Sequence, residues 1–153
     1  MNFYSQSLKR AGCFVSLIGL GRPDVSIVGA PQAENLKMSI KERRAISDGG
    51  FFQKPGSFGN LPTGEAFIAP VEKTAEGVAI IDGNSFLPGV KLDQPIKITF
   101  RWGRAWRIKG GEAAEILKET LLRIGSNSNK LAELGIGTNP QAIISPASIS
   151  PLE

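Results

Sequence analysis

Glycine and proline interrupt this 153-residue chain along its whole length, with 18 Gly and 10 Pro. Proline fixes φ and lacks an amide proton, while glycine accepts a positive φ that other residues avoid. A chain interrupted this often does not form a bundle of long helices. The sequence therefore predicts short strands joined by many turns, and its length suffices for one domain with a sizeable core.

Alternation of apolar and polar residues with a period of two predicts two of these strands, at residues 36–41 and 96–101. Trp102-Gly103 follows the second run and predicts a hairpin into residues 104–108. Composition and turn signals predict further strands at 25–28, 66–71, 78–81 and, ending in a glycine-rich turn, 131–140.

One segment, residues 112–124, has the pattern of an amphipathic helix. Its predicted apolar stripe consists of Ala113, Ile116, Leu117, Thr120, Leu121 and Ile124. Gly125 supplies the stop. The expected fold class is α+β, rich in strands, with a largely antiparallel or mixed sheet and one clear helix near 112–124.

Three other segments carry weaker patterns. Residues 3–10 fit a short helix, and residues 13–20 fit a buried strand or helix. Residues 48–59 combine four glycines with Phe51, Phe52 and Phe58, so we expect a loop whose aromatic rings hold it against the body of the protein.

The chain has no histidine and one cysteine, Cys13. These counts exclude a Ser-His-Asp or Cys-His catalytic arrangement within this sequence, and they leave carboxylates and carbonyls as metal ligands. A single thiol fits a reducing cytoplasm, and no apolar run is long enough for a membrane span. We therefore expect a cytoplasmic protein without a membrane partner.

Two glutamates stand in unusual settings. Glu65 follows the turn-forming Pro62 and Gly64 and begins an apolar strand, which suits a metal ligand or general base but also an ordinary exposed residue. Glu133 lies among apolar residues, so either a cation compensates its charge or it alternates to the solvent face. The residues alone leave both alternatives open.

Cations and aromatic rings interleave between Arg101 and Lys109, as on a nucleic-acid platform. A hairpin with one apolar face toward the core explains the same residues, and the net charge is only +4. We expect no nucleic-acid partner. Gly135-Ile136-Gly137 lacks the residues that complete a phosphate-binding loop.

The blocks at residues 60–72, 75–77, 81–83, 110–113 and 131–140 resemble, in the same order, the leucyl aminopeptidase family of the aminopeptidase T and aminopeptidase S type. The resemblance implies a metal-dependent aminopeptidase, a hydrolase that removes N-terminal residues from peptides. It implies two divalent ions, zinc, cobalt or manganese, and it places family metal ligands at Glu65 and Glu133. No catalytic side chain is carried over.

The later histidine-bearing blocks of that family have no counterpart here. The resemblance thus divides the chain into a poorly matching segment, 1–22, and a truncated catalytic domain, 23–153. The expectation is an incomplete, inactive fragment of a metalloprotease. The alternatives are a binding or assembly module, associating for example as a homodimer, and a relative of the iron-dependent ring-opening dioxygenases.

Overall fold

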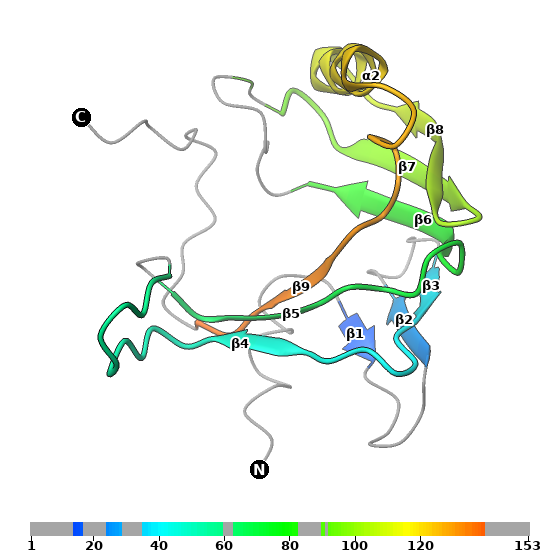
Figure 1. Cartoon of the computed structure of the whole chain (residues 1–153). Coiled ribbons are helices and arrows are strands. Elements are labelled where there is room, and N and C mark those ends of the chain that lie inside the picture. Colours follow the sequence, from blue (N-terminus) through cyan, green and yellow to red (C-terminus); the bar gives the residue numbers. More distant parts are fainter. Residues whose placement is uncertain are drawn as a thin grey trace.

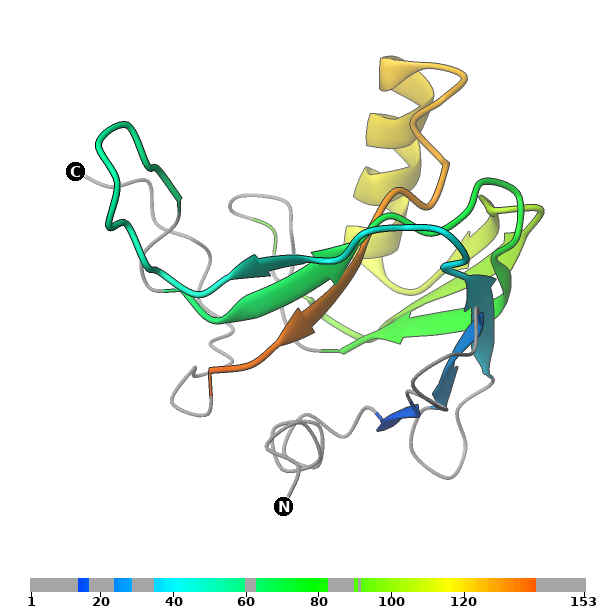
Figure 2. The same ribbon diagram turned by 60° about the horizontal axis from the view of Figure 1, so that its bottom comes forward.

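The computed structural model describes residues 14–16, 24–28, 35–59, 63–82, 90 and 92–139, with the backbone alone for the first two segments. Two antiparallel sheets and one helix make up this part of the chain, which confirms the predicted α+β class. The helix lies against one end of the larger sheet, and the smaller sheet extends away from it (Figures 1 and 2).

The larger sheet has six strands in the order β1-β2-β3-β6-β7-β8. Its strands are β1 (Phe14–Ser16), β2 (Asp24–Val28), β3 (Leu36–Ser39), β6 (Glu76–Ile81), β7 (Ile96–Arg101) and β8 (Arg104–Lys109). Alternation is clearest in β3, where Leu36 and Met38 are buried and Lys37 is exposed. This strand and the β7–β8 hairpin confirm the predictions from period-two patterning.

The turn of that hairpin requires unusual backbone conformations. Trp102 has φ 54° and Gly103 has φ 69°, the pair of positive values that suits a tight hairpin turn. A side chain at Gly103 would also meet the backbone of Lys73, whose amide nitrogen lies 2.7 Å from the position of the added Cβ. Glycine is therefore needed here both for conformation and for space.

The helix α2 (Glu112–Ile124) has the predicted bounds. The Oδ2 atom of Asp93, from the preceding connection, accepts a hydrogen bond from the amide of Glu112 at 3.2 Å. Desolvation acts to raise the pKa of Asp93, but backbone amide hydrogen bonds, that of Glu112 foremost, hold this pKa below its ordinary value of 3.8. The start of α2 is thus capped by a residue from outside the helix.

The buried face of α2 differs from the predicted stripe. Ala113, Ala114 and Leu117 are buried, whereas Ile124 is 70% exposed and Leu122 is 82% exposed. The fully buried residues lie in the first two turns, and Leu121 is the residue of the last turn that packs against the core. The prediction for Ile124 was therefore wrong.

The smaller sheet has the order β4-β5-β9, with all pairs antiparallel. Its strands are β4 (Ile46–Asp48), β5 (Glu65–Ile68) and β9 (Leu134–Gly137). The chain enters β9 directly after the segment that follows α2 (Figure 2). Leu134 is buried with the residues of the larger sheet, and Ile68 packs against the same core, so the two sheets share one hydrophobic core.

Three further predictions from the sequence concern one strand, the amino-terminal segments and membrane spans. The predicted strand at 66–71 is shorter and shifted, at Glu65–Ile68. The helix predicted at 3–10 lies outside the described residues, and of 13–20 the structure describes only β1. Among the described residues, no helix is long and apolar enough to cross a membrane.

Candidate metal-binding site

Glu65 is the first residue of β5, and hydrogen bonds fix the backbone that precedes it. The Oγ1 atom of Thr63 and the amide of Gly64 both donate to the carbonyl oxygen of Asp48, at 2.6 Å and 3.2 Å. From the other side, the amide of Thr138 donates to the carbonyl oxygen of Gly64 at 2.7 Å. The prediction that Glu65 enters its strand from a stiffly held turn is confirmed.

Gly64 allows this close approach of three segments. Its φ is 125°, and a Cβ added to it would lie 2.6 Å from the Cβ of Asn139. The side-chain amide of Asn139 in turn donates to the carbonyl oxygen of Thr63 at 3.3 Å. The turn before Glu65 is therefore held between β4 and the residues that follow β9.

A second acidic residue, Asp48, which was not predicted as a ligand, pairs with Glu65. Asp48 is the last residue of β4 and pairs directly with Glu65 in the antiparallel ladder. Directly opposed residues share a face and have Cβ atoms about 4.5–5.5 Å apart. Both residues are half-buried. The pairing register alone reveals this relationship, because 17 positions separate the two residues along the sequence.

Glycines of β9 make room on the same face. Gly137 pairs with Glu65, and a Cβ added to Gly137 would meet no atom within 4 Å. A Cβ on Gly135 would collide with Oε1 of Glu65, so this carboxylate lies over Gly135. The predicted strand at 131–140 is present but shorter, at Leu134–Gly137, and its two glycines lie in the strand, where the missing side chains leave space beside Glu65.

Glu133 lies just before β9 and is exposed. Its neighbour Leu134 pairs with Ile68, so Glu133 stands about four residues further along the ladder than Glu65, a separation on the order of 13 Å. The structure thus brings the two predicted ligands onto neighbouring segments of one sheet without direct contact. The described residues contain no group of three or more His, Cys, Asp or Glu side chains able to hold a metal.

A cavity of about 460 Å³ adjoins Asp48. It is lined by Ser47, Asp48, Gly49, Gly50, Phe51, Phe52, Gly56, Ser57 and Phe58. Phe51 is 83% exposed and Phe58 is 95% exposed, so the prediction that aromatic packing holds this loop against the body was wrong for these two rings. Phe52 is the better packed of the three, with its ring beside Gly59.

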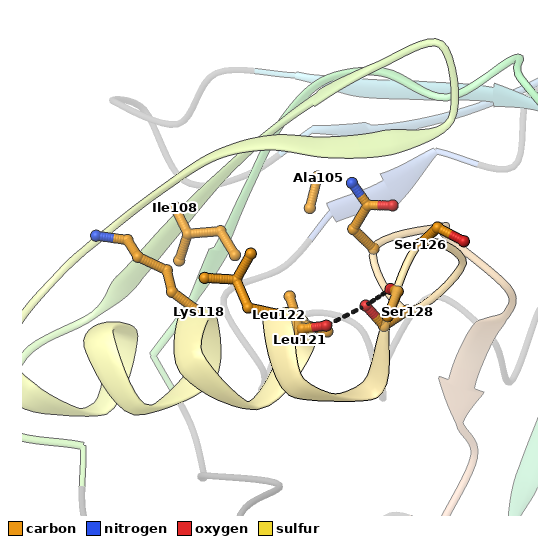
Figure 3. A pocket seen from close by; sticks show the side chains of 9 residues that line it. Ala105, Ile108, Lys118, Leu121, Leu122, Ser126 and Ser128 are labelled. Atoms are coloured by element: carbon orange, nitrogen blue, oxygen red, sulfur yellow. Dashed lines mark hydrogen bonds between the residues drawn. The ribbon is translucent and has the colours of Figure 1, made fainter.

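A second cavity, also about 460 Å³, lies between the carboxyl-terminal half of α2 and β8 (Figure 3). Leu121, Leu122 and Ile108 form much of its wall. Its one charged residue, Lys118, is paired with Glu115 at 2.6 Å. No pair of acidic groups faces this space among the lining residues, so it is a poor candidate for a metal site.

Glu72 belongs to the same sequence block as Glu65 but has a different role. It forms an ion pair with Arg43 at 2.5 Å. A backbone hydrogen bond of Glu72 itself, followed by the positive charge of Arg43, holds the pKa of Glu72 below its ordinary value. The ion pair joins the connection between β3 and β4 to the connection between β5 and β6, so Glu72 does not lie in the small sheet beside Glu65.

Fold and site together define a strand-rich α+β protein in which two acidic residues, Asp48 and Glu65, pair across neighbouring strands of a small antiparallel sheet. The sequence profile of NicX, described as 2,5-dihydroxypyridine 5,6-dioxygenase, matches residues 27–150. The chain therefore belongs to this family. No curated protein matches the sequence.

Among solved structures, the chain is similar to wild-type AmpT from Thermus thermophilus, with 25% sequence identity and a TM-score of 0.48. The match covers 79% of this chain and 28% of AmpT, so this chain spans little more than a quarter of that protein.

Proposed function

We propose that this chain supplies the carboxylate edge of a divalent-metal site in a ring-opening dioxygenase acting on hydroxylated pyridines. Family membership supports the reaction class. The observation that carries the metal site is the register that opposes Asp48 and Glu65 on adjacent strands. The sequence resemblance implies Glu65 and Glu133 as metal ligands. We include Asp48 as a third candidate ligand because it pairs directly with Glu65.

The donor chemistry fits a hard or borderline divalent ion. Carboxylate oxygens bind Mg²⁺, Mn²⁺ and Fe²⁺, and two like charges directly opposed across a ladder repel each other unless a cation lies between them. Gly135 leaves room for the carboxylate of Glu65, and Gly137 borders open space. Both features favour an ion at the face shared by Asp48 and Glu65.

The donor set is nevertheless partial. Two opposed carboxylates leave coordination positions for water, for substrate or for donors outside the described residues, so the expected affinity is low. When bound, the ion supplies the open coordination positions that oxygenase chemistry requires. The contribution of these residues is to hold two negative charges on one face of a rigid sheet.

Manganese binding by the full chain, followed by electron paramagnetic resonance, tests the metal site. Asp48→Asn and Glu65→Gln should each weaken binding by tenfold or more, since each removes one charged ligand. Gly135→Ala should also weaken it, because the new methyl group displaces the Glu65 carboxylate. The control, Glu119→Gln, removes one charge from an exposed position of α2 and should bind like the wild type, and equal binding by all four variants would exclude this site.

Oxygen uptake tests the reaction class. The chain loaded with Fe²⁺ without oxygen is mixed with 2,5-dihydroxypyridine and air, and ring opening is followed by loss of substrate absorbance and by consumption of oxygen. Activity that disappears in Glu65→Gln supports the proposal. Metal binding without oxygen uptake would keep the metal site and reject the dioxygenase reaction for this chain.

A metal-dependent aminopeptidase is the second candidate. Two of the sequence blocks that resemble aminopeptidases of the T and S type contain Glu65 and Glu133. One block includes β5 and the other includes β9, and these two strands pair directly. This pairing is the observation that favours the peptidase. Hydrolysis of a leucine amide in the presence of zinc or cobalt distinguishes the two reactions. Release of leucine without oxygen uptake would favour the peptidase.

A further inference from the structure

The β7–β8 hairpin concentrates the positive charge of the protein. Residues 96–109 contain five lysines and arginines and no aspartate or glutamate, whereas the whole chain has a formal net charge of +4. The remainder of the chain is therefore slightly acidic. The modest net charge understates how basic this one region is.

The cations of the hairpin share one face. In β7, Ile96, Ile98 and Phe100 are buried in the core, so the residues between them point to the opposite face. The ladder pairs Lys97 with Lys109, Thr99 with Arg107 and Arg101 with Arg104. Directly opposed like charges are destabilising. The opposed pair Arg101–Arg104 therefore indicates a surface that an anion would stabilise.

Both tryptophans of the chain lie in this hairpin and are exposed. Trp102, at the turn, is 73% exposed, and Trp106, in β8, is 67% exposed. The register of the β7–β8 ladder shifts at Trp106, so this residue has no directly opposed partner in β7. From the sequence, a hairpin with one apolar face toward the core was expected to account for these residues. The hairpin does direct one apolar face to the core, but the exposures show that Trp102 and Trp106 do not belong to it.

Cations and rings are in contact on this surface. The guanidinium of Arg101 lies 5.9 Å from the centre of the Trp106 ring. Within the described part of the chain, no ion pair joins Arg101, Arg107 or Lys109 to an acidic side chain. Arg104 is different, because its Nη1 atom donates to Ser126 and Asn129.

We propose that the outer face of the β7–β8 hairpin binds single-stranded nucleic acid. Arg101, Arg107 and Lys109 contact the phosphates, and the exposed ring of Trp106 stacks on a base. Interleaved cations and aromatic rings are the features that single-strand binding surfaces combine. Tryptophan and arginine also occur at protein interfaces, but residues 96–109 contain no acidic side chain, which favours a polyanion such as nucleic acid. The surface lies on the larger sheet, so it is independent of the carboxylates on β4 and β5.

The test uses intrinsic fluorescence, because the only two tryptophans of the chain, Trp102 and Trp106, both report on this surface. The full chain is titrated with a 15-nucleotide oligothymidine at 50 mM salt. Saturable quenching is expected, with an affinity that falls as salt rises. Trp106→Ala should weaken binding about fivefold or more, measured by anisotropy of the labelled oligonucleotide, and Trp106→Phe should retain most of it.

Arg101→Ala/Arg107→Ala should reduce the slope of log K against log salt by about 1.4. The matched control is Arg44→Ala/Lys54→Ala, which removes the same charge from exposed positions elsewhere and should keep the slope within a few tenths of that of the wild type. Circular dichroism checks that each variant is folded. Absence of binding, or equal slopes in the two double variants, would overturn the proposal. Equal displacement by poly-L-glutamate, with Trp106→Ala binding as wild type, would overturn it in favour of an acidic protein partner.

Discussion

Asp48 and Glu65 lie directly opposite each other at the end of the β4–β5 ladder. Their carboxylates occupy one face of the small sheet, and the carbonyl of Asp48 also holds the turn that leads into Glu65. This arrangement places two negative charges on one face of a rigid sheet, where like charges on directly opposed residues are destabilising.

Asp48→Asn should stabilise the metal-free protein. Removing one of two opposed like charges is worth about 0.2–1 kcal/mol. Urea unfolding in the presence of a chelator measures the change. Glu65→Gln should raise the free energy of unfolding by a similar amount. The double variant should gain less than the sum of the two single variants, because either substitution alone already removes the repulsion between the two charges. Additive effects would contradict direct repulsion between the two groups.

Gly64→Ala should destabilise the turn before β5 by more than Gly56→Ala destabilises its loop. Both glycines have positive φ, 125° and 80°, so each substitution carries a conformational cost of about 1 kcal/mol or more. Only Gly64 also has a close neighbour, the Cβ of Asn139 at 2.6 Å, whereas Gly56 faces open space. Thermal unfolding of the two variants provides the comparison. Equal losses would show that Asn139 moves away freely.

Asp93→Asn should change how stability depends on pH. The folded pKa of Asp93 lies below the ordinary value of 3.8, so the charged form stabilises the native state above that pH. This contribution is lost as pH falls through the folded pKa. The wild type should therefore lose more of its melting temperature than the variant between pH 5 and pH 3. Parallel curves for the two proteins would show that the cap carries no such charge effect.

Leu117→Ala should cost about 2–5 kcal/mol, because Leu117 is 5% exposed within the shared core. Leu122→Ala, five positions later on the same helix, should change stability by less than about 0.5 kcal/mol, since Leu122 is 82% exposed. The pair controls for helix propensity, as the chemical change is the same. Urea midpoints measure both. Comparable losses would contradict the orientation of α2.

Local patterns predicted much of the fold. The helix 112–124, the alternation in β3 and the hairpin at Trp102-Gly103 all follow from interactions between residues close in sequence. Errors arose where a residue depends on distant segments. Ile124 is apolar at helical spacing, yet its side chain is 70% exposed among the described residues. Phe51 and Phe58 are aromatic, yet their loop extends away from the core.

The sequence by itself determined that Glu65 begins a strand after a constrained turn, because proline and glycine restrict the backbone locally. Only the tertiary structure decided that Asp48 faces Glu65 and that Gly135 makes room for its carboxylate. Strand register is set by which hydrophobic faces meet the shared core and by the hydrogen bonds between distant strands. That information is spread over the whole chain, so no single segment carries it.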